Sequence, residues 1–355
     1  MSNEIISLRQ LLHAHPERSG EEARTKALIL DFLRTHTSLE LLPCGDGFYA
    51  AHREDCTSKP AIALRADYDA LPTPNGSAAH LCGHDGHAAA LCGVALCLEG
   101  HTFGRNIFLL FQPAEETGQG AKTCLSLFER EKIGEIYGAH NLPGYPLGVL
   151  YTRPGTFACA SMGLTISLLG APAHAAYPEY GISPADAVGK LLCALPTIAE
   201  PSQYSGMTLC TVIGAQMGEK AFGSAASQAE IWLTLRAEHD RDLAALQTSI
   251  LKTAQGLARD ARLTFSHQVQ DAFPATENEP QCAQRVLSLP GAELLEVPMR
   301  WSEDFGHYLQ RCPGAYFGIG AGEHCPALHT EHYEYPDALL QPTVNAFLQL
   351  ITCEP

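Results

Sequence analysis

Short apolar segments, each ended by Gly, Pro or Asp, alternate with helical stretches in the first part of the chain. Apolar runs of this length between such breakers are typical of buried strands. The runs begin at Ala61, Asn106, Ile136 and Gly148, and the stretches 88–98 and 121–131 between them are predicted helices. Alternating strands and helices predict an α/β layer structure.

An earlier helix is predicted from Ile29, Phe32 and Leu33, which form one apolar face. The residues before it, Ser-Gly-Glu-Glu from Ser19 to Glu22, have the spacing of a capping box. We therefore expect Ser19 to cap this helix.

The hydrophobic pattern changes near Ser161. The segment 163–170 alternates apolar and polar residues, as a half-exposed strand does. Ser183 and Pro184 are the predicted N-cap and first position of the next helix. The segments 207–214, 229–238, 241–258 and 262–270 then predict strand, strand, helix and strand. This β-α-β-β-α-β order is the ferredoxin-like pattern.

The remainder of the chain contains a helix, the strand 314–322 and a last helix from Pro336. We therefore predict an α/β catalytic domain with a central mixed sheet, formed by residues 1–157 and 270–355. An inserted α+β ferredoxin-like domain of residues 158–269 interrupts it.

Composition and charge exclude some partners. The 355 residues carry a formal net charge of −16, which argues against nucleic acid and anionic membranes, since both require clustered Lys and Arg. The N-terminus lacks an apolar segment of signal-peptide length, and the longest apolar stretches are far shorter than a membrane span. The thirteen cysteines are scattered, as reduced cysteines are. We expect a cytoplasmic protein.

The segment AHLCGHDGHAAALCG, from Ala79 to Gly93, brings a thiol, two imidazoles and a carboxylate together. In an extended segment Cys82 and His84 point to the same side, and Gly83 and Gly86 allow a tight turn. Such a turn can present a thiolate and an imidazole to one metal ion or to two neighbouring ions. A lone Cys-x-His also occurs by chance.

Adjacent carboxylates follow the apolar run that ends at Pro113. Glu115 and Glu116 lie where a strand of an α/β sheet meets the ligand crevice, although acidic residues also suit an ordinary first helical turn. One carboxylate of such a pair can bind a metal while the other takes a proton from the water that the metal activates.

Further acids and imidazoles lie at the ends of other apolar runs. His140 and His329 each follow a predicted strand, and Asp67, Asp69 and His174 lie at loop ends. Taken singly, such a histidine is more often structural.

Together these motifs carry a family resemblance over nearly the whole chain. The chain resembles the amidohydrolase branch of the dinuclear metallopeptidases related to aminoacylase, which includes hippurate hydrolases, indoleacetyl-amino-acid hydrolases and N-acetyl-diaminopimelate deacetylases. The matching segments, in order, are LRQLLHAHPERSGEEARTKALI, LRADYDALP, HLCGHDGHAAALCG, FLLFQPAEETGQGA, GAHNLP, GAPAHAAYPEYGISP, SEDFGHYLQRCPGAYFGIGAG and ALHTEHY.

The resemblance implies a site with two divalent metal ions. It implies that Cys82 bridges or binds the ions, that Glu115 is the general base and then the acid, and that Asp69 orients a metal ligand. The other implied metal ligands are His84, Glu116, His140 and His329. A thiolate favours zinc, with manganese, nickel and cobalt as alternatives.

The inserted domain has implied roles as well. In relatives it makes the dimer, and a histidine at the place of His174 stabilises the oxyanion, reaching the partner's site. Arg236 is kept as a candidate substrate-binding residue, while His87 and Asp85 are expected to be hydrogen-bonding members of their turn.

The chain also departs from the family pattern. The loop 73–81 is short, and Gly223 in the segment Gly223–Gln228 stands roughly where relatives carry an Asn. Pro172 and Ala173 replace the usual Gly-Gly before His174.

The expected activity is cleavage of the amide bond of N-acyl amino acids or small dipeptide-like compounds. One alternative is a thiol hydrolase using Cys82 and His84, which leaves the other candidate residues without a role. The other is a metal- or ligand-binding relative without turnover, which the altered segment Gly223–Gln228 favours.

Overall fold

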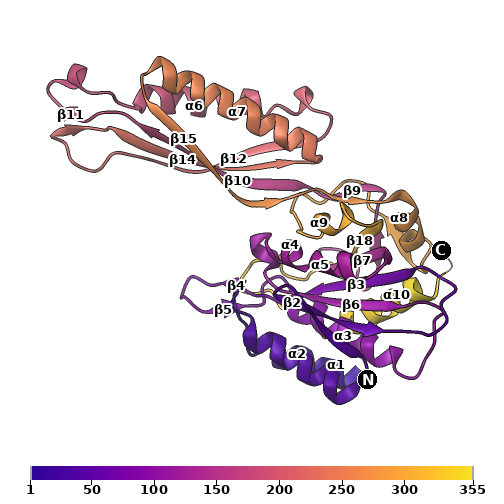
Figure 1. Cartoon of the computed structure of the whole chain (residues 1–355). Helices are drawn as coiled ribbons and strands as arrows, with labels where there is room; N and C mark the ends of the chain where they lie inside the picture. The colour runs from indigo at the N-terminus through magenta and orange to yellow at the C-terminus, as the bar shows by residue number, and fades with distance from the viewer. Residues whose placement is uncertain (1, 354–355) are drawn as a thin grey trace. The chain divides into compact units, whose positions relative to one another are not determined.

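The computed structural model of the chain describes residues 2–353 (Figure 1). Contacts divide the chain into two compact units. Unit 1 comprises the chain up to Phe157, Thr276–Pro298 and the chain from Glu303 onward, and unit 2 comprises Ala158–Ala275 with Met299–Ser302. The sequence placed the second boundary after residue 269, whereas strand β15 (Thr264–Phe273) continues beyond that residue.

Unit 1 is built on an eight-stranded mixed sheet with the order β1-β2-β6-β3-β7-β18-β8-β17. Strand β3 pairs in parallel with β6 and β7, and β18 pairs in parallel with β7 and antiparallel with β8. The strands are β1 (Glu40–Cys44), β2 (Gly47–His52), β3 (Ala61–Asp67), β6 (Ile107–Gln112), β7 (Ile133–Pro143), β8 (Leu150–Thr152), β17 (Ala292–Leu294) and β18 (Gly314–Gly322). The predicted α/β fold with a central mixed sheet is confirmed.

The helices of unit 1 pack around this sheet. They are α1 (Ser2–His13), α2 (Ala23–His36), α3 (His84–Leu98), α4 (Gly120–Cys124), α5 (Ser126–Arg130), α8 (Pro280–Leu287), α9 (Gly306–Leu309) and α10 (Leu340–Thr352). Helix α3 is buried on nearly every side because α1, α10 and β3 pack against it. Its sequence is accordingly apolar all round, as a helix inside a core requires. The start of α3 is thereby held rigidly within the unit.

Two local predictions in unit 1 are wrong. Helix α2 begins at Ala23 with Glu22 at the N-cap position and no side-chain cap, so Ser19 does not cap it. The hydroxyl of Ser19 instead donates to Asp69 Oδ2 at 2.7 Å. The predicted helix 121–131 is divided into α4 and α5 at Leu125.

Unit 2 is a four-stranded antiparallel sheet with the order β12-β14-β10-β15, and two helices cover one of its faces (Figure 1). Along the chain its main elements are β10 (Ala160–Leu169), α6 (Ala185–Ile198), β12 (Thr208–Met217), β14 (Gln228–Ala237), α7 (Asp240–Asp260) and β15. Leu164, Ile166 and Leu168 alternate on β10 and form a core with leucines of both helices. Helix α6 begins one residue later than predicted, with Pro184 at the N-cap position.

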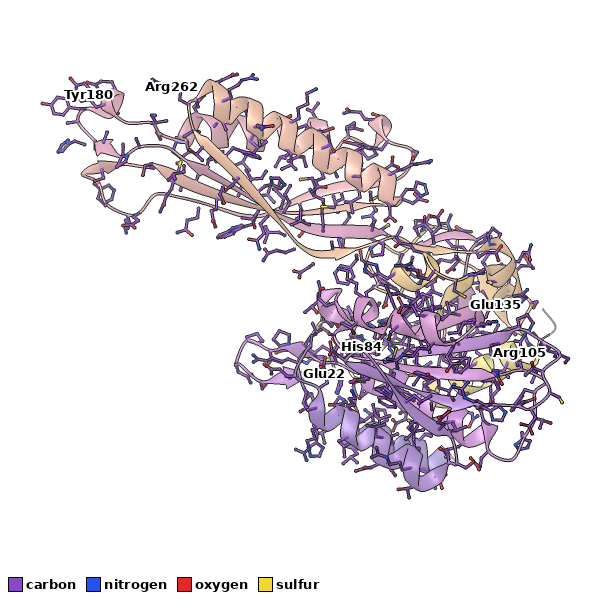
Figure 2. All side chains as sticks on the ribbon, in the orientation of Figure 1. Glu22, His84, Arg105, Glu135, Tyr180 and Arg262 are labelled. Atoms are coloured by element: carbon purple, nitrogen blue, oxygen red, sulfur yellow. The ribbon has the colours of Figure 1, made fainter. Side chains whose placement is uncertain are left out.

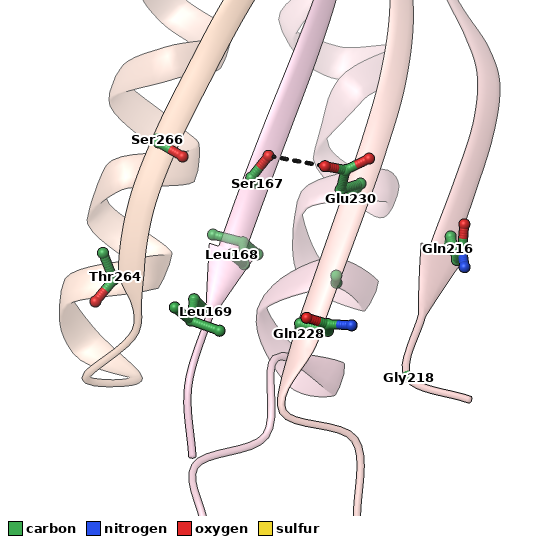
Figure 3. A pocket seen from close by; sticks show the side chains of 10 residues that line it. Ser167, Leu168, Leu169, Gln216, Gly218, Gln228, Glu230, Thr264 and Ser266 are labelled. Atoms are coloured by element: carbon green, nitrogen blue, oxygen red, sulfur yellow. Dashed lines mark hydrogen bonds between the residues drawn. The ribbon is translucent and has the colours of Figure 1, made fainter. Parts of the chain in front are cut away.

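Figure 2 labels residues of both units, among them Glu22 and His84 in unit 1 and Tyr180 and Arg262 in unit 2. Unit 2 also has a hollow of about 390 Å³ on its sheet, where Ser167 donates to Glu230 at 3.4 Å (Figure 3). None of the predicted site residues lines it.

Between residues 2 and 353, no helix combines the length and apolarity needed to cross a bilayer.

Candidate metal centre

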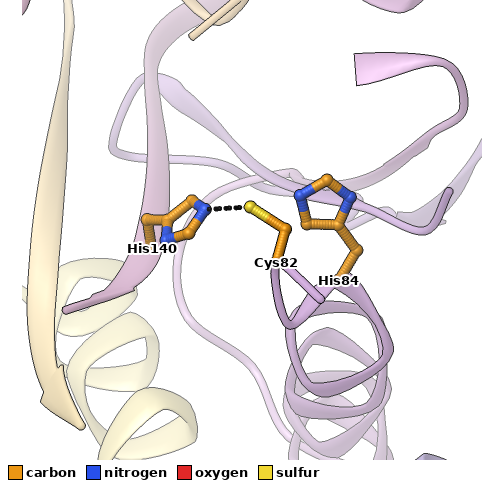
Figure 4. A group of neighbouring side chains, drawn as sticks. All are labelled: Cys82, His84 and His140. Atoms are coloured by element: carbon orange, nitrogen blue, oxygen red, sulfur yellow. Dashed lines mark hydrogen bonds between the residues drawn. The ribbon is translucent and has the colours of Figure 1, made fainter. Parts of the chain in front are cut away.

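Cys82, His84 and His140 meet at one end of α3 (Figure 4). The sulfur of Cys82 lies 3.3 Å from Nε2 of His140 on β7. The expected extended segment is absent: Gly83 is left-handed, with φ 95°, and His84 is the first residue of α3. A Cβ at residue 83 would lie 2.6 Å from Asn141 Oδ1, so glycine is required for this turn.

Glu116 and His329 complete the group of predicted metal ligands. Oε1 of Glu116 lies 3.8 Å from Nε2 of His84 and 3.6 Å from Nε2 of His329. His329 lies in the loop after β18, where its N–H donates to the carbonyl of Leu81. The structure thus brings all the predicted metal ligands together, although they come from segments far apart in the sequence.

Several atoms of this group suit a bound cation. Nε2 of His84 and Oε1 of Glu116 are buried, have no hydrogen-bond partner and lie near each other. Burial, followed by the charges of Glu116 and Glu115, raises the pKa of the Cys82 thiol well above its usual range. A divalent cation would offset this negative charge and favour the thiolate. The residues therefore fit a metal of the zinc type.

Asp69 connects three parts of the site. Its Oδ1 lies 2.9 Å from Nδ1 of His84, and its Oδ2 accepts hydrogen bonds from the hydroxyl of Ser19 and the N–H of Glu116. An acceptor on Nδ1 leaves Nε2 of an imidazole free to bind a metal. This geometry suits the orienting role that the resemblance implies for Asp69.

His87 and Asp85 have partners of their own. Nδ1 of His87 lies 2.7 Å from Asp67, and its Nε2 lies 2.6 Å from Asn141 Oδ1. Asp85 lies 2.8 Å from Nδ1 of His13. Asp67, to which the sequence assigned no role, also has a carboxylate oxygen close to ring nitrogens of His84 and His87.

A buried ionic network lies beside the group, and sequence reasoning missed it. Arg65 donates to Asp67 at 2.6 Å, to Asp304 at 2.9 Å and to Glu303 at 3.5 Å. Gln112 donates to both oxygens of Asp304. The available signal was a charged residue, Arg65, inside an apolar strand, because a buried charge requires a partner.

Glu115 lies where this network meets the candidate metal ligands. It is buried, and its Oε1 accepts the N–H of Asp304 at 3.3 Å. Burial, followed by the charges of Glu303, Asp304 and Glu116, raises its pKa well above the usual range. Burial also raises the pKa of Glu116, to about 7, with the charges of Asp69 and Asp67 adding to the effect and that of His84 opposing it. A raised pKa makes Glu115 a better proton acceptor.

The remaining predicted residues lie in unit 2. His174 is exposed, and its Nδ1 accepts the N–H of Ala176 at 3.1 Å. The short strand β11 (Ala173–His174) pairs with β13 (Ser224–Ala225), so the altered segment Gly223–Gln228 lies directly beside His174. Nη1 of Arg236 donates to the carbonyl of Arg300 and to the hydroxyl of Ser302.

Known proteins are similar to this chain over nearly its whole length. N-acetyldiaminopimelate deacetylase of Leuconostoc citreum is 28% identical over 368 residues, covering 96% of this chain and 94% of the relative. N-acetyl-L-cysteine deacetylase of Bacillus subtilis is 28% identical, covering 91% of this chain and 82% of the relative.

Solved structures share the fold. A putative aminohydrolase from methicillin-resistant Staphylococcus aureus matches with a TM-score of 0.89 at 23% identity, covering 99% of this chain and 97% of the other. A dinuclear metal binding peptidase of the M20 family from Bacillus subtilis matches with a TM-score of 0.82, also at 23% identity, with the same coverage.

The family itself follows from a match to residues 63–352, which is most of the chain. The resemblance found in the sequence is thereby confirmed: the chain belongs to peptidase family M20/M25/M40.

Proposed function

We propose that the protein is a metal-dependent amidohydrolase that cleaves the amide bond of N-acyl amino acids or small dipeptide-like compounds. The observation that carries this proposal is the convergence of thiol, imidazole and carboxylate ligand atoms beside the buried carboxyl group of Glu115. Membership of a peptidase family and relatives named as deacetylases support it.

Two divalent ions are the proposed cofactors, held by Cys82, His84, Glu116, His140 and His329. When bound, such ions polarise a substrate carbonyl and make water a stronger nucleophile. The thiolate of Cys82 favours zinc, and manganese, nickel or cobalt are the alternatives.

Glu115 is the proposed proton carrier. Its carboxylate accepts a proton from the attacking water and later returns it to the leaving nitrogen, so that the amine departs neutral. Burial, followed by the charges of the neighbouring Glu303 and Asp304, raises its pKa, which favours proton uptake. The N–H of Asp304 restrains the direction of the Glu115 side chain.

The inserted segment 158–269, which makes up most of unit 2, is the proposed ferredoxin-like lid and dimerisation domain. His174 would donate a hydrogen bond to the developing oxyanion of its own or a partner's site. A substrate contact by Arg236 would use the guanidinium atoms other than Nη1, which is engaged by Arg300 and Ser302. The homodimer and a cytoplasmic location stay predictions.

The thiol-hydrolase alternative is disfavoured by the environment of Cys82. His140 does lie within 3.3 Å of the sulfur, as in a thiol–imidazole pair. The pKa of the thiol is nevertheless raised by burial and by acidic neighbours. A nucleophilic cysteine requires the opposite shift, which cationic surroundings produce.

A hydrolysis screen tests the proposal. N-acetyl, N-benzoyl and indoleacetyl amino acids are incubated with protein refilled with Zn, Mn, Co or Ni, and the released amine is measured. We expect turnover that a chelator abolishes, and a metal content near two ions per chain. A ceiling of one ion at full activity would contradict the dinuclear model. Inhibition by iodoacetamide without any chelator effect would favour the thiol mechanism, and tight binding without turnover the non-enzymatic one.

A further inference from the structure

The segment Ser19–Glu22, which the sequence predicted to be a helix cap, contacts the candidate site instead. Ser19 donates to Asp69, as described above. The carboxylate of Glu22 is buried, with 6% of the residue exposed, and belongs to the same unit as His84 (Figure 2). The mechanism proposed above gives this buried acid no task.

Glu22 binds the backbone immediately before the two catalytic-site carboxylates. Its Oε1 accepts the N–H of Ala114 at 2.9 Å and the N–H of Gly20 at 2.8 Å. Residues 22 and 114 are 92 positions apart in sequence. The contact therefore joins the N-terminal segment to the loop after β6.

Ala114 is held in an unfavourable backbone conformation. Its φ is 52°, in the left-handed region that a residue with a Cβ adopts only at an energetic cost. The carbonyl of Ala114 accepts the N–H of Gly120 at 3.0 Å and the hydroxyl of Thr117 at 3.2 Å. At the other end of Ala114, Glu22 restrains the backbone by accepting the hydrogen bond of the Ala114 N–H.

This kink sets the direction of the chain into Glu115 and Glu116. Glu116 has a second restraint, because its N–H donates to Asp69. The carbonyl of Ala114, next to Glu115, is held from within the same loop, whereas the N–H of Ala114 is held by Glu22 from a distant segment of the chain. Without the bond to Glu22, Ala114 can relax to an ordinary backbone conformation and turn Glu115 away, while Glu116 keeps its bond to Asp69.

We propose that Glu22 is a positioning residue for Glu115, acting through the N–H of Ala114. The proposal rests on the function proposed above, since it takes Glu115 as the proton carrier. Loss of the Glu22 acceptor lowers kcat because the carboxylate of Glu115 no longer lies correctly against the attacking water. Substrate affinity and metal binding change much less.

The test compares four full-length proteins refilled with the same metal. Glu22→Met keeps the side-chain volume and removes the acceptor, whereas Glu22→Gln keeps an oxygen for Ala114. Glu21→Met is the matched control, because Glu21 is the adjacent, exposed glutamate. The readouts are kcat, KM, metal content and hydrogen exchange of the peptide 112–118.

For Glu22→Met we expect faster exchange in 112–118 and a fall in kcat of about tenfold or more, the scale of a small misplacement of a reacting group. KM and metal content should stay near those of the wild type. Glu22→Gln should recover most of the loss in both exchange and kcat, and Glu21→Met should match the wild type. If Glu22→Met does not fold, Glu22→Asp replaces it with the same expectations, because the shorter side chain withdraws its oxygen from Ala114.

Unchanged exchange in 112–118, or faster exchange with kcat within twofold of the wild type, overturns the proposal. A fall in metal content as large as the fall in kcat also overturns it, because Glu22 would then support the ligands generally. A failure of the proposed function looks different. In that case the wild type shows no turnover, while the exchange pattern still distinguishes Glu22→Met from Glu22→Gln.

Discussion

Asp69 Oδ1 lies 2.9 Å from Nδ1 of His84, and both side chains are buried. The contact leaves Nε2 of His84 facing Glu116 Oε1, 3.8 Å away. Burial would otherwise lower the pKa of His84, but the charges of Asp67 and Asp69 together with the bond to Asp69 raise it well above the usual range. The carboxylate therefore sets both the orientation of the ring and its electron-donating strength.

Asp69→Asn should accordingly weaken metal binding. The amide keeps the shape of the side chain but loses its charge, and a change of this kind costs about 10- to 100-fold in metal affinity. Metal titration by calorimetry measures the effect, with the exposed Asp260→Asn as control. Equal affinities of Asp69→Asn and wild type would show that Asp69 does not orient His84.

Glu115→Gln separates the proton carrier from the metal ligands. The substitution removes the proton acceptor and keeps the shape, so kcat should fall by about 10²- to 10⁴-fold, the usual range for general acid–base catalysis. Elemental analysis should find the wild-type metal content. Glu116→Gln should lose metal first, and the exposed Glu129→Gln should behave as the wild type. Near-normal turnover of Glu115→Gln would mean that another group carries the proton.

His174→Ala addresses the role of unit 2. A donor aimed at the oxyanion acts mainly in the transition state, so kcat should fall by about 10²-fold or more while KM rises less. Metal content and thermal unfolding should stay unchanged, because His174 is an exposed residue of unit 2.

Mixed dimers test whether His174 acts across subunits. His174→Ala and Glu115→Gln chains are each expected to have lost most of their activity. If His174 acts across the subunits of a dimer, a hybrid of the two chains holds one site with both groups intact. Reassembled mixtures should therefore recover part of the activity. Hybrids that form and remain inactive would restrict His174 to its own chain.

The pH dependence of stability should report on His307. Burial, followed by the charge of Lys122, lowers its pKa to about 4. In the unfolded chain, where a histidine has a pKa of about 6.5, His307 is protonated at a higher pH than in the folded protein. The free energy of unfolding should thus fall as the pH drops from about 6.5 to about 4. The contribution of His307 to this fall should end once the pH is below the pKa that His307 has in the folded protein.

The measurement for His307 uses urea unfolding at several pH values with chelator present throughout. His307→Asn cannot take up the proton, so the wild type should lose more stability than the variant between pH 7 and pH 4.5. A constant difference between the two proteins over that range would show that His307 is not held neutral by the fold.

Local pattern was sufficient to predict several strands of the sheet, although the segments that form β1, β2 and β17 were not predicted. The candidate ligands were noticed by pattern, and the family resemblance supplied their roles. The apolar run 314–322 coincides with β18, because a strand buried on both faces needs a continuous apolar sequence. His140 and His329 were singled out from their positions near the ends of such runs. These features depend only on neighbouring residues, which a sequence displays directly.

Contacts between distant segments could not be predicted in this way. Ser19 was assigned to a helix cap because its spacing to Glu22 suits one, whereas both side chains bind groups of the site. The turn at Gly83 brings Cys82 and His84 together by a left-handed residue instead of an extended segment. Such outcomes follow from tertiary packing, which overrides a weak local preference.

The place of β18 in the sheet has a consequence for the nascent protein on the ribosome. β18 lies between β7, which ends at Pro143, and β8, yet it begins only at Gly314. The four strands of unit 2 are all synthesised by Phe273, so their sheet can form while the centre of the other sheet still lacks a strand. His329 emerges later still. Metal binding by the full proposed ligand set therefore requires a chain synthesised at least to His329, and a product truncated before that residue cannot complete the set.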